Sequence, residues 1–281
     1  MQSTVLRSPL RPRSSGLPQV NILGVGIHAI DMAMALDVIE TAINRKNKGY
    51  VCAANVHVVM EAQDSAEFKQ LLNSSLMTVP DGRPLVWLGR LWGVRSISQV
   101  GGPEMLDELC DLSRRKGYTH YFYGGAPGVA EQLREIMIAR YPGLRVVGAY
   151  SPPFRQLTSD EERQLSGSFA SLKPDITWIG LGAPKQEKFM ANYLDLLDTT
   201  VMIGVGAAFD MNTGRIKDAP RWAKKCGAAW LFRLVQDPQR LWKRYLKTNP
   251  SFLWNAFLQT LHFKKFELEV SQGFVEDARS Q

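Results

Sequence analysis

The sequence predicts an α/β fold, in which a Rossmann-like, mainly parallel sheet carries helices on both faces and is followed by a helical C-terminal appendage. Short runs that are apolar throughout alternate with amphipathic segments of helical spacing. Continuously apolar runs are typical of strands buried on both faces, and therefore of a parallel sheet. After Phe209 the alternation stops and only helical spacing remains.

Each predicted strand is bounded by turn residues or by the start of a helix. The strands are expected at 20–27, 50–54, 76–80, 118–123, 144–149, 175–181 and 200–205. Asp31 and Thr158 are of the types that cap helix N-termini. The helices are expected at 31–45, 58–73, 84–92, 103–116, 129–140, 158–172 and 184–196. In the remainder, Pro220, Pro238 and Pro250 are expected to interrupt the helical pattern.

The length favours one α/β domain with an addition. The chain has 281 residues, more than one typical domain and fewer than two. Its 45% hydrophobic and 22% charged content excludes wholesale disorder. We expect a disordered basic tail at 1–19, the Rossmann-like core at 20–214, a basic aromatic helical appendage at 215–266 and a flexible tail at 267–281.

Composition and motifs exclude several classes of site. Cys52, Cys110 and Cys226 lie far apart, which excludes a disulfide framework and a CxxC site, and the histidines form no close pair. The patterns GxxxxGK[ST] and GxSxG are absent, and GVGAAFD lacks the third glycine of a dinucleotide fingerprint. We therefore expect no metal and no cofactor. No apolar run approaches the roughly 20 residues of a membrane span, and no signal peptide is evident, so we expect a cytoplasmic protein.

The positive charge is concentrated near the C-terminus. The net charge is +7, yet residues 215–265 alone hold twelve lysines and arginines and two acids, and they are also rich in tryptophan and phenylalanine. Basic and aromatic residues at helical spacing are typical of a helix on an anionic membrane. A solvated basic face over ordinary core aromatics is the alternative. A nucleic-acid surface is less favoured, because no binding motif accompanies the charge.

Polar and glycine residues follow most of the predicted strands. Ligands of parallel sheets bind at the carboxyl ends of the strands, so these positions are the candidates for function. Their chemistry indicates a pocket for phosphate and sugar groups. They are Asn55 and His57; Asp81, Gly82 and Arg83; Gly124 and Gly125; Gly182, Lys185, Gln186 and Glu187; and Gly206 and Asp210.

Two of these segments have both a structural and a functional interpretation. In VPDGRP, spacing alone favours Asp81 as a turn residue before Gly82. The alternative is a general base, which a partly desolvated carboxylate at a strand end can provide. In GLGAPKQEKFM, Pro184 and the residues after it make a good first helical turn, and the same helix start can bind an anion beside Lys185.

The order of the motifs resembles one family. PDGRPLVW, GGAPG, YPGL, LGAPKQEKFM, GVGAAFDMNTG and the basic RL-x-x-DP-x-RL-x-x-RY segment follow one another over residues 20–258. They resemble the WecG/TagA/CpsF glycosyltransferases. The resemblance implies a Rossmann-like fold and inverting transfer of a sugar from a UDP-sugar to a polyprenyl-diphosphate-linked saccharide. It further implies an appendage that contacts the membrane and helps to close the active site.

The resemblance also implies roles for individual residues. Asp81 matches the family's proposed catalytic base, and Asn55 matches a pocket asparagine. Gln186 and Asp210 match donor-site positions. Three appendage arginines match residues thought to reach the diphosphate, which makes a metal unnecessary. They are Arg233, Arg240 and Arg244.

Two departures from the family pattern leave the donor sugar open. Ala53 stands where members often have threonine, and Gln99 begins a stretch in which many have arginine. The expected protein is thus a UDP-sugar-dependent hexosyltransferase of exopolysaccharide or cell-surface polysaccharide synthesis, peripheral on the inner face of the plasma membrane. A homo-oligomer is left open, and nucleic acid is not expected as a partner. The alternatives are a nucleotide-dependent oxidoreductase or epimerase, and a non-enzymatic membrane-binding module.

Overall fold

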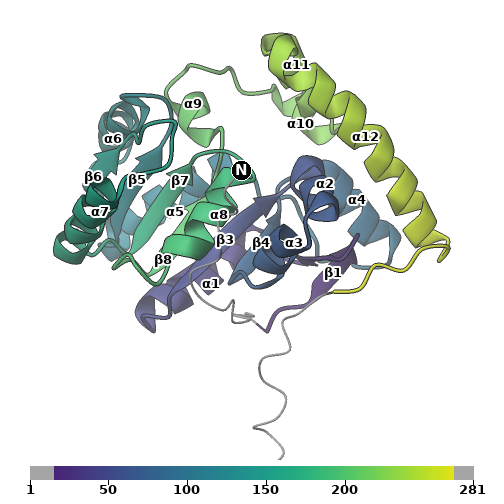
Figure 1. The fold of residues 1–281 in the computed structure, drawn as a ribbon, viewed down its shortest axis with the longest axis horizontal. Helices are drawn as coiled ribbons and strands as arrows, with labels where there is room; N and C mark the ends of the chain where they lie inside the picture. Colours follow the sequence, from purple (N-terminus) through teal and green to yellow (C-terminus); the bar gives the residue numbers. More distant parts are fainter. Residues whose placement is uncertain (1–15, 269–281) are drawn as a thin grey trace, which may run out of the picture.

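The core is a six-stranded parallel sheet. The computed structural model describes residues 16–268, except for the side chains of Arg221, Lys225 and Arg240. The sheet order is β4-β3-β8-β7-β5-β6, and all five strand pairs are parallel (Figure 1). The strands are β3 (Gly49–Ala54), β4 (Met77–Pro80), β5 (Thr119–Gly124), β6 (Arg145–Tyr150), β7 (Ile176–Gly180) and β8 (Val201–Gly204). The predicted α/β class and mainly parallel sheet are confirmed.

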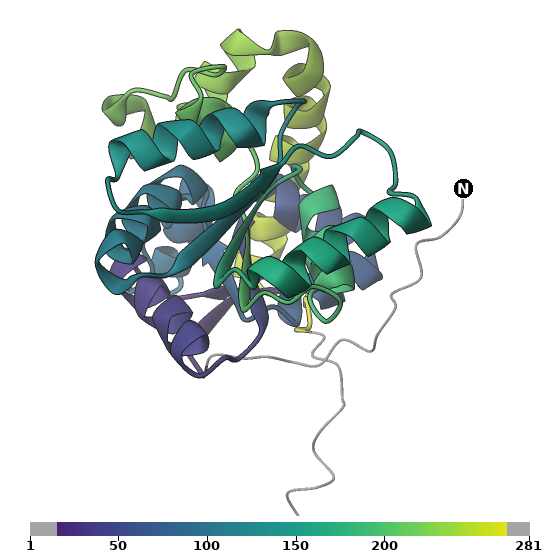
Figure 2. The ribbon, with the colours of Figure 1, turned by 90° about the vertical axis from the view of Figure 1, so that its left-hand side faces the viewer.

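Helices cover both faces of this sheet (Figures 1 and 2). One apolar core lies between the sheet and α1 (Met32–Asn44), α5 (Gly102–Lys116), α6 (Val129–Arg140) and α9 (Ala208–Asn212). The other lies beneath α2 (Val56–Asp64), α3 (Ala66–Asn73), α4 (Arg83–Leu91), α7 (Ser159–Leu172) and α8 (Lys185–Tyr193). The side chains of each strand alternate between the two cores. Tyr121 and Tyr123 belong to one and Phe122 to the other, which is why the strands read as continuous apolar runs.

The first predicted strand, 20–27, is instead a hairpin outside the main sheet. β1 (Gln19–Ile22) pairs antiparallel with β2 (Val25–His28). Leu23 and Gly24 join them with φ values of 52° and 83°, the left-handed conformation that two-residue hairpin turns adopt. The run VNILGVGI hides this turn because the first turn residue is a buried leucine.

Two helical predictions need correction. The single helix expected over 58–73 is divided into α2 and α3 at Ser65, whose extended backbone ends one helix and whose hydroxyl accepts from Phe68 N–H to cap the next. Pro250 does not interrupt the last helix: it lies inside α12 (Pro238–Thr260).

The C-terminal helices form a separate layer beside the sheet. α10 (Arg221–Lys225), α11 (Ala229–Gln236) and the long α12 lie on the right-hand side of Figure 1, and α12 packs against α2. The far end of α12 is bound to the hairpin: Gln259 accepts from Leu23 N–H at 3.0 Å and donates to Asn21 O at 2.9 Å. Within the described residues no helix combines the length and hydropathy that a membrane span requires. The predicted tails lie outside the described residues except for 16–19 and 267–268, and Gln19 already begins β1.

Candidate active site

One large cavity opens at the carboxyl edge of the sheet. Its volume is about 1940 Å³, and it is lined by the segments after β3, β4, β5, β7 and β8 and by the appendage helices. Single-ligand pockets are commonly about 300–1,000 Å³, so this cavity has room for two substrates. The predicted site residues that line it are Asn55, Asp81, Gly82, Arg83, Gly125, Lys185, Gln186, Asp210, Arg233 and Arg244. The eleventh, Arg240, lies in α12, but its side chain is outside what the structure describes.

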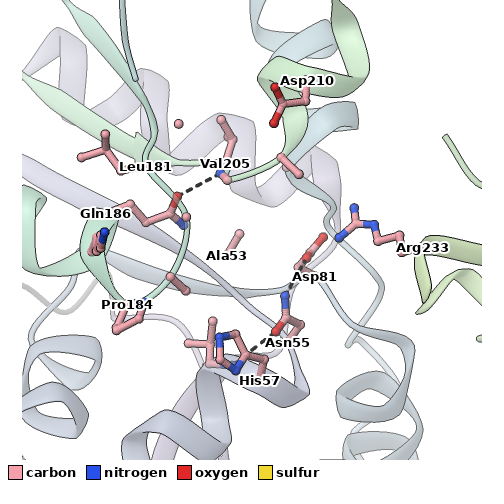
Figure 3. A pocket seen from close by; sticks show the side chains of 18 of the residues that line it. Ala53, Asn55, His57, Asp81, Leu181, Pro184, Gln186, Val205, Asp210 and Arg233 are labelled. Atoms are coloured by element: carbon pink, nitrogen blue, oxygen red, sulfur yellow. Dashed lines mark hydrogen bonds between the residues drawn. The ribbon is translucent and has the colours of Figure 1, made fainter. Parts of the chain in front are cut away.

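The strand register places Asn55 beside Asp81. Ala54 and Pro80, the last residues of β3 and β4, are paired, so the residues that follow them are neighbours. Asn55 caps α2, because its Oδ1 accepts from Val58 N–H at 3.3 Å. That bond turns Nδ2 toward the Asp81 carboxylate, 3.5 Å away and at the long limit of a hydrogen bond. Figure 3 shows the two side chains and Arg233 directed toward one another.

The Asp81 backbone is held firmly while its carboxylate faces the cavity. Its N–H donates to Ala54 O at 2.8 Å, and the Gln99 side chain donates to its carbonyl oxygen at 2.7 Å. Asp81 and Gly82 join β4 directly to α4, and this connection presents the Asp81 side chain to the cavity. Gly82 lies close to Asn55: a Cβ at position 82 would be 3.3 Å from the Cα and Cβ of Asn55, a tight contact.

The electrostatics of Asp81 favour proton acceptance. Burial raises the pKa of its carboxyl above the ordinary value, and the nearby Arg233 charge and the Asn55 amide only partly offset this. A carboxylate with a raised pKa binds a proton more readily, which is what a general base requires. Glu104 adds a further increase to the pKa of Asp81.

Arginines from three helices enter the same cavity. Arg83 comes from α4, Arg233 from α11 and Arg244 from α12. The Nε atoms of Arg83 and Arg244 are buried without a hydrogen-bond partner among the described residues. Buried donors without partners are costly, and anionic oxygens would satisfy them. The arrangement therefore suits a diphosphate.

The opposite side of the cavity is formed by α8, α9 and a glycine turn. Lys185 begins α8, and Asp210 lies in α9 (Figure 3). Gly125 has φ +77°, and a Cβ there would lie 2.7 Å from Val129 Cβ, so only glycine fits this turn. Gln186 is 3% exposed and accepts from Gly206 N–H, so it supports the cavity wall as well as lining it.

Glu187 and His57 were among the strand-end candidates, but sequence reasoning assigned a role to neither. Glu187 is fully buried, and burial raises the pKa of its carboxyl to about 7; its pattern was that of an ordinary acidic first helical turn. His57 lines the cavity, where burial and then the Arg244 charge lower the pKa of its imidazole to about 4. The position of His57, two residues after Asn55 at the end of β3, was the feature of the sequence that indicated a place in the cavity. Within the described part of the chain, no cluster of three or more His, Cys, Asp or Glu residues could hold a metal ion.

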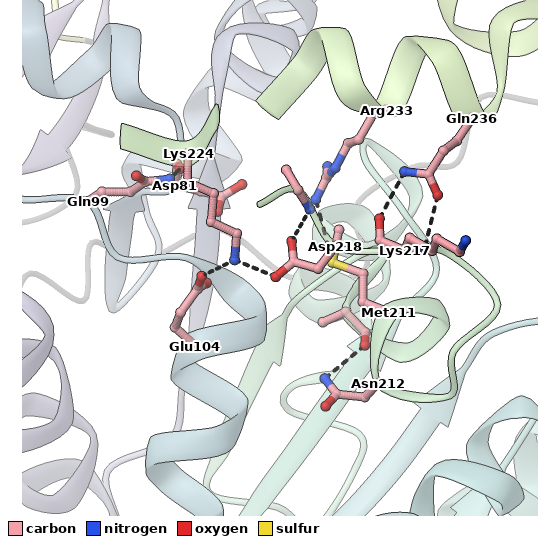
Figure 4. A network of polar contacts seen from close by, with 12 residues as sticks. Asp81, Gln99, Glu104, Met211, Asn212, Lys217, Asp218, Lys224, Arg233 and Gln236 are labelled. Atoms are coloured by element: carbon pink, nitrogen blue, oxygen red, sulfur yellow. Dashed lines mark hydrogen bonds and ion pairs between the residues drawn. The ribbon is translucent and has the colours of Figure 1, made fainter. Parts of the chain in front are cut away.

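Polar contacts hold the appendage over the cavity (Figure 4). Lys224 of α10 contacts Glu104 of α5 at 2.7 Å and Asp218 at 2.5 Å. Gln236 of α11 exchanges two 2.9 Å hydrogen bonds with the backbone of Lys217. These contacts join the core to the segment that carries Arg233.

Comparison with known proteins gives the family. A model of the glycosyl transferase WecG/TagA/CpsF family matches residues 20–266. The chain belongs to this family. The family match favours a glycosyltransferase over the oxidoreductase and epimerase alternatives, in agreement with a cavity that carries no dinucleotide fingerprint.

Two curated relatives of the chain have more specific names. The chain is 30% identical over 209 residues to the N-acetylglucosaminyldiphosphoundecaprenol N-acetyl-beta-D-mannosaminyltransferase of Bacillus spizizenii, covering 74% of this chain and 79% of the relative. It is 30% identical over 204 residues to the enzyme of the same name from Bacillus subtilis, covering 73% of this chain and 77% of the relative. Both names describe transfer to a lipid-diphosphate-linked sugar.

Proposed function

We propose that the chain transfers a sugar from a UDP-sugar to a polyprenyl-diphosphate-linked saccharide, with inversion and without a metal, in the synthesis of an exopolysaccharide or other surface polysaccharide. The observation that carries the proposal is the half-buried Asp81 carboxylate, which faces arginines from the appendage across a cavity with room for two substrates. Family membership and the names of the two relatives support the same reaction class.

The proposed reaction is a single displacement at the anomeric carbon. Asp81 takes the proton of the attacking acceptor hydroxyl, the new glycosidic bond forms, and the bond to the UDP oxygen breaks. Arg233, Arg240 and Arg244, together with Lys185 at the start of α8, stabilise the negative charge of the departing UDP. Asn55 holds the carboxylate in place through its amide nitrogen.

The acceptor lipid makes a membrane location part of the proposal. Exposed apolar side chains of α12, among them Leu253 (66%), Trp254 (61%) and Phe257 (51%), lie on the same helix as the basic Lys243 and Lys247. Such a surface suits an anionic bilayer. We place the protein on the inner face of the plasma membrane, where UDP-sugars are available.

The Asp81→Asn variant tests the base. Asparagine keeps the shape of the side chain and cannot accept the proton, so kcat should fall by about 10²–10⁴-fold. The measurement is UDP release from a panel of UDP-sugars with a polyprenyl-diphosphate-linked N-acetylglucosamine acceptor. UDP binding by calorimetry should be retained, as the control for folding. Turnover close to that of the unaltered chain would refute Asp81 as the base.

A further inference from the structure

Three groups form a buried hydrogen-bond relay from α8 to the chain after β8. Gln186 Nε2 donates to Glu187 Oε1 at 2.8 Å. Gly206 N–H donates to Gln186 Oε1 at 2.9 Å, the bond drawn as a dashed line from Gln186 in Figure 3. Gln186 is 3% exposed and Glu187 fully buried. The relay ends at Gly206, four residues before Asp210 on the cavity wall.

The relay fixes which end of the Gln186 amide faces which neighbour. A carboxylate only accepts hydrogen bonds, so it requires the amide nitrogen. The amide oxygen is thereby left for Gly206 N–H. The reversed amide would set oxygen against oxygen and NH₂ against N–H, which leaves two buried polar groups unpaired.

We propose that Glu187 is a positioning residue, which orients the Gln186 amide and through it holds the Gly206 segment that forms the donor end of the cavity. The claim that this segment binds a nucleoside diphosphate rests on the proposed function. The relay itself does not, because it can be measured without any substrate.

The surroundings of Glu187 leave it no other evident task. Its Oε2 has no hydrogen-bond partner among the described residues, and no ion pair joins it there. The adjoining strands β7 and β8 carry no titratable residue. Titratable groups on the helix itself and on the other packed elements are Lys185, Lys188 and Tyr193 of α8, Glu67 and Lys69 of α3, and Tyr50 and Cys52 of β3.

The cost of this burial supports a role in the site. Burial raises the pKa of the Glu187 carboxyl to about 7, because the ionised form loses its hydration. A buried carboxyl with one amide partner lowers the stability of the fold relative to a neutral side chain. Costly buried groups are concentrated at sites where they orient other residues.

Amide hydrogen exchange of residues 201–212 tests the relay directly. Glu187→Leu removes the acceptor, so the amide can reverse, and Gly206 N–H should exchange about tenfold faster. Glu187→Gln is the matched control, since its carbonyl oxygen replaces the acceptor, and its exchange at Gly206 relative to that of β5 should equal the ratio found in the unaltered chain. Unchanged exchange in Glu187→Leu would overturn the inference.

A second variant covers the case in which Glu187→Leu fails to fold. Glu187→Asp keeps the carboxylate and withdraws it by one methylene from Gln186, so the 201–212 segment should again exchange faster. Exchange in β5, which the relay does not touch, should stay unchanged and reports global stability. Faster exchange in both segments, or in neither, contradicts a local positioning role.

UDP affinity by calorimetry provides the functional readout. Glu187→Leu and Glu187→Asp should bind UDP about tenfold more weakly, and Glu187→Gln should restore the affinity. Absence of UDP binding by the unaltered chain would refute the proposed function while the exchange result still decides the relay. Tight UDP binding by all variants would refute the link between Glu187 and the donor site.

Discussion

At the scale of single residues, the site is built by side chains whose orientation is fixed by a neighbour. Asn55 uses its oxygen to cap α2 and therefore presents its nitrogen to Asp81. Gln99 holds the carbonyl of Asp81 from the other side. The carboxylate is thus aimed by bonds that are not themselves part of any reaction.

Asn55→Asp should shift the pH dependence of turnover. Aspartate caps helices as well as asparagine does, so α2 should remain intact. The amide donor is lost and a second negative charge stands beside Asp81, so the pKa of Asp81 should increase further. Because the base must be ionised, the acidic limb of the kcat/KM profile should move to higher pH. Asn55→Ser, which keeps the cap without the charge, should move it less; equal limbs in all three proteins would contradict the assignment.

Most of the site residues could be predicted because of one rule about parallel sheets. The rule places residues after strands at a shared edge, and it located Asn55, Asp81 and Gln186 together. It says nothing about which side chains turn inward within the first helical turn. Glu187 was therefore treated as an ordinary acidic residue near a helix start, although the structure buries it fully.

At the scale of elements, α10 and α11 are joined to the core by a few polar contacts. Lys224 connects Glu104 and Asp218, whose side chains are 48% and 46% exposed, so solvent screens both pairs and we expect a contribution of only about 0.2–1 kcal/mol. Elements held this weakly can open and close, which substrate entry into the cavity requires.

Lys224→Met should loosen this contact without unfolding the core. The appendage should then spend more time away from the core, so amide hydrogen exchange over residues 215–236 should increase. The KM for the donor should rise about threefold, because the same segment carries Arg233. Lys116→Met is the control, because it removes a similar pair with Glu40 away from the cavity. An equal change of KM and of hydrogen exchange in Lys224→Met and Lys116→Met would contradict the view that the Lys224 contacts control closure of the appendage.

The apolar side chains of α12 make a separate prediction about membranes. Replacing Leu253 and Trp254 by alanine should reduce recovery with anionic vesicles severalfold, because each exposed side chain loses apolar contact with the bilayer. Leu196→Ala, at a 46% exposed leucine of the core, should leave recovery unchanged. Full vesicle binding by the double variant would refute the proposal that these side chains of α12 contact the membrane.

Elements of several turns that are bounded by turn residues were predicted well, and elements that depend on a single local bond were not. The helix over 129–140 agrees with α6 in both bounds. Ser65 divides a continuous helical pattern through one cap bond, and a buried leucine conceals the turn between β1 and β2. Propensity and periodicity average over several residues, so they do not detect such events.

At the scale of the whole molecule, Glu187 predicts how stability depends on pH. The folded-state pKa of about 7 lies above the ordinary value of 4.5, so the folded chain binds the extra proton between these values. The free energy of unfolding should therefore fall as pH rises from 4.5 to 7 and then level off. Glu187→Gln lacks this loss and should be more stable than the unaltered chain above pH 7, by about 3 kcal/mol. Urea titrations at pH 5 and pH 8 measure it, and an equal difference at both pH values would contradict the assignment.

The overall arrangement was predictable as a parallel sheet with a helical addition, whereas the attachment of that addition was not. Gln259 binds the hairpin residue Leu23 across 236 positions in the sequence. No periodic pattern carries information about such a contact, because it depends on the path of the whole chain.

That attachment also has a consequence for synthesis on the ribosome. Leu23 leaves the exit tunnel long before Gln259, so the N–H of Leu23 and the carbonyl of Asn21 lack this partner until residue 259 has been made. A product that stops before residue 259 therefore keeps an incompletely bonded hairpin, however well its sheet has formed. Synthesis of residue 259 is therefore the step after which the hydrogen bonding of this hairpin can be completed.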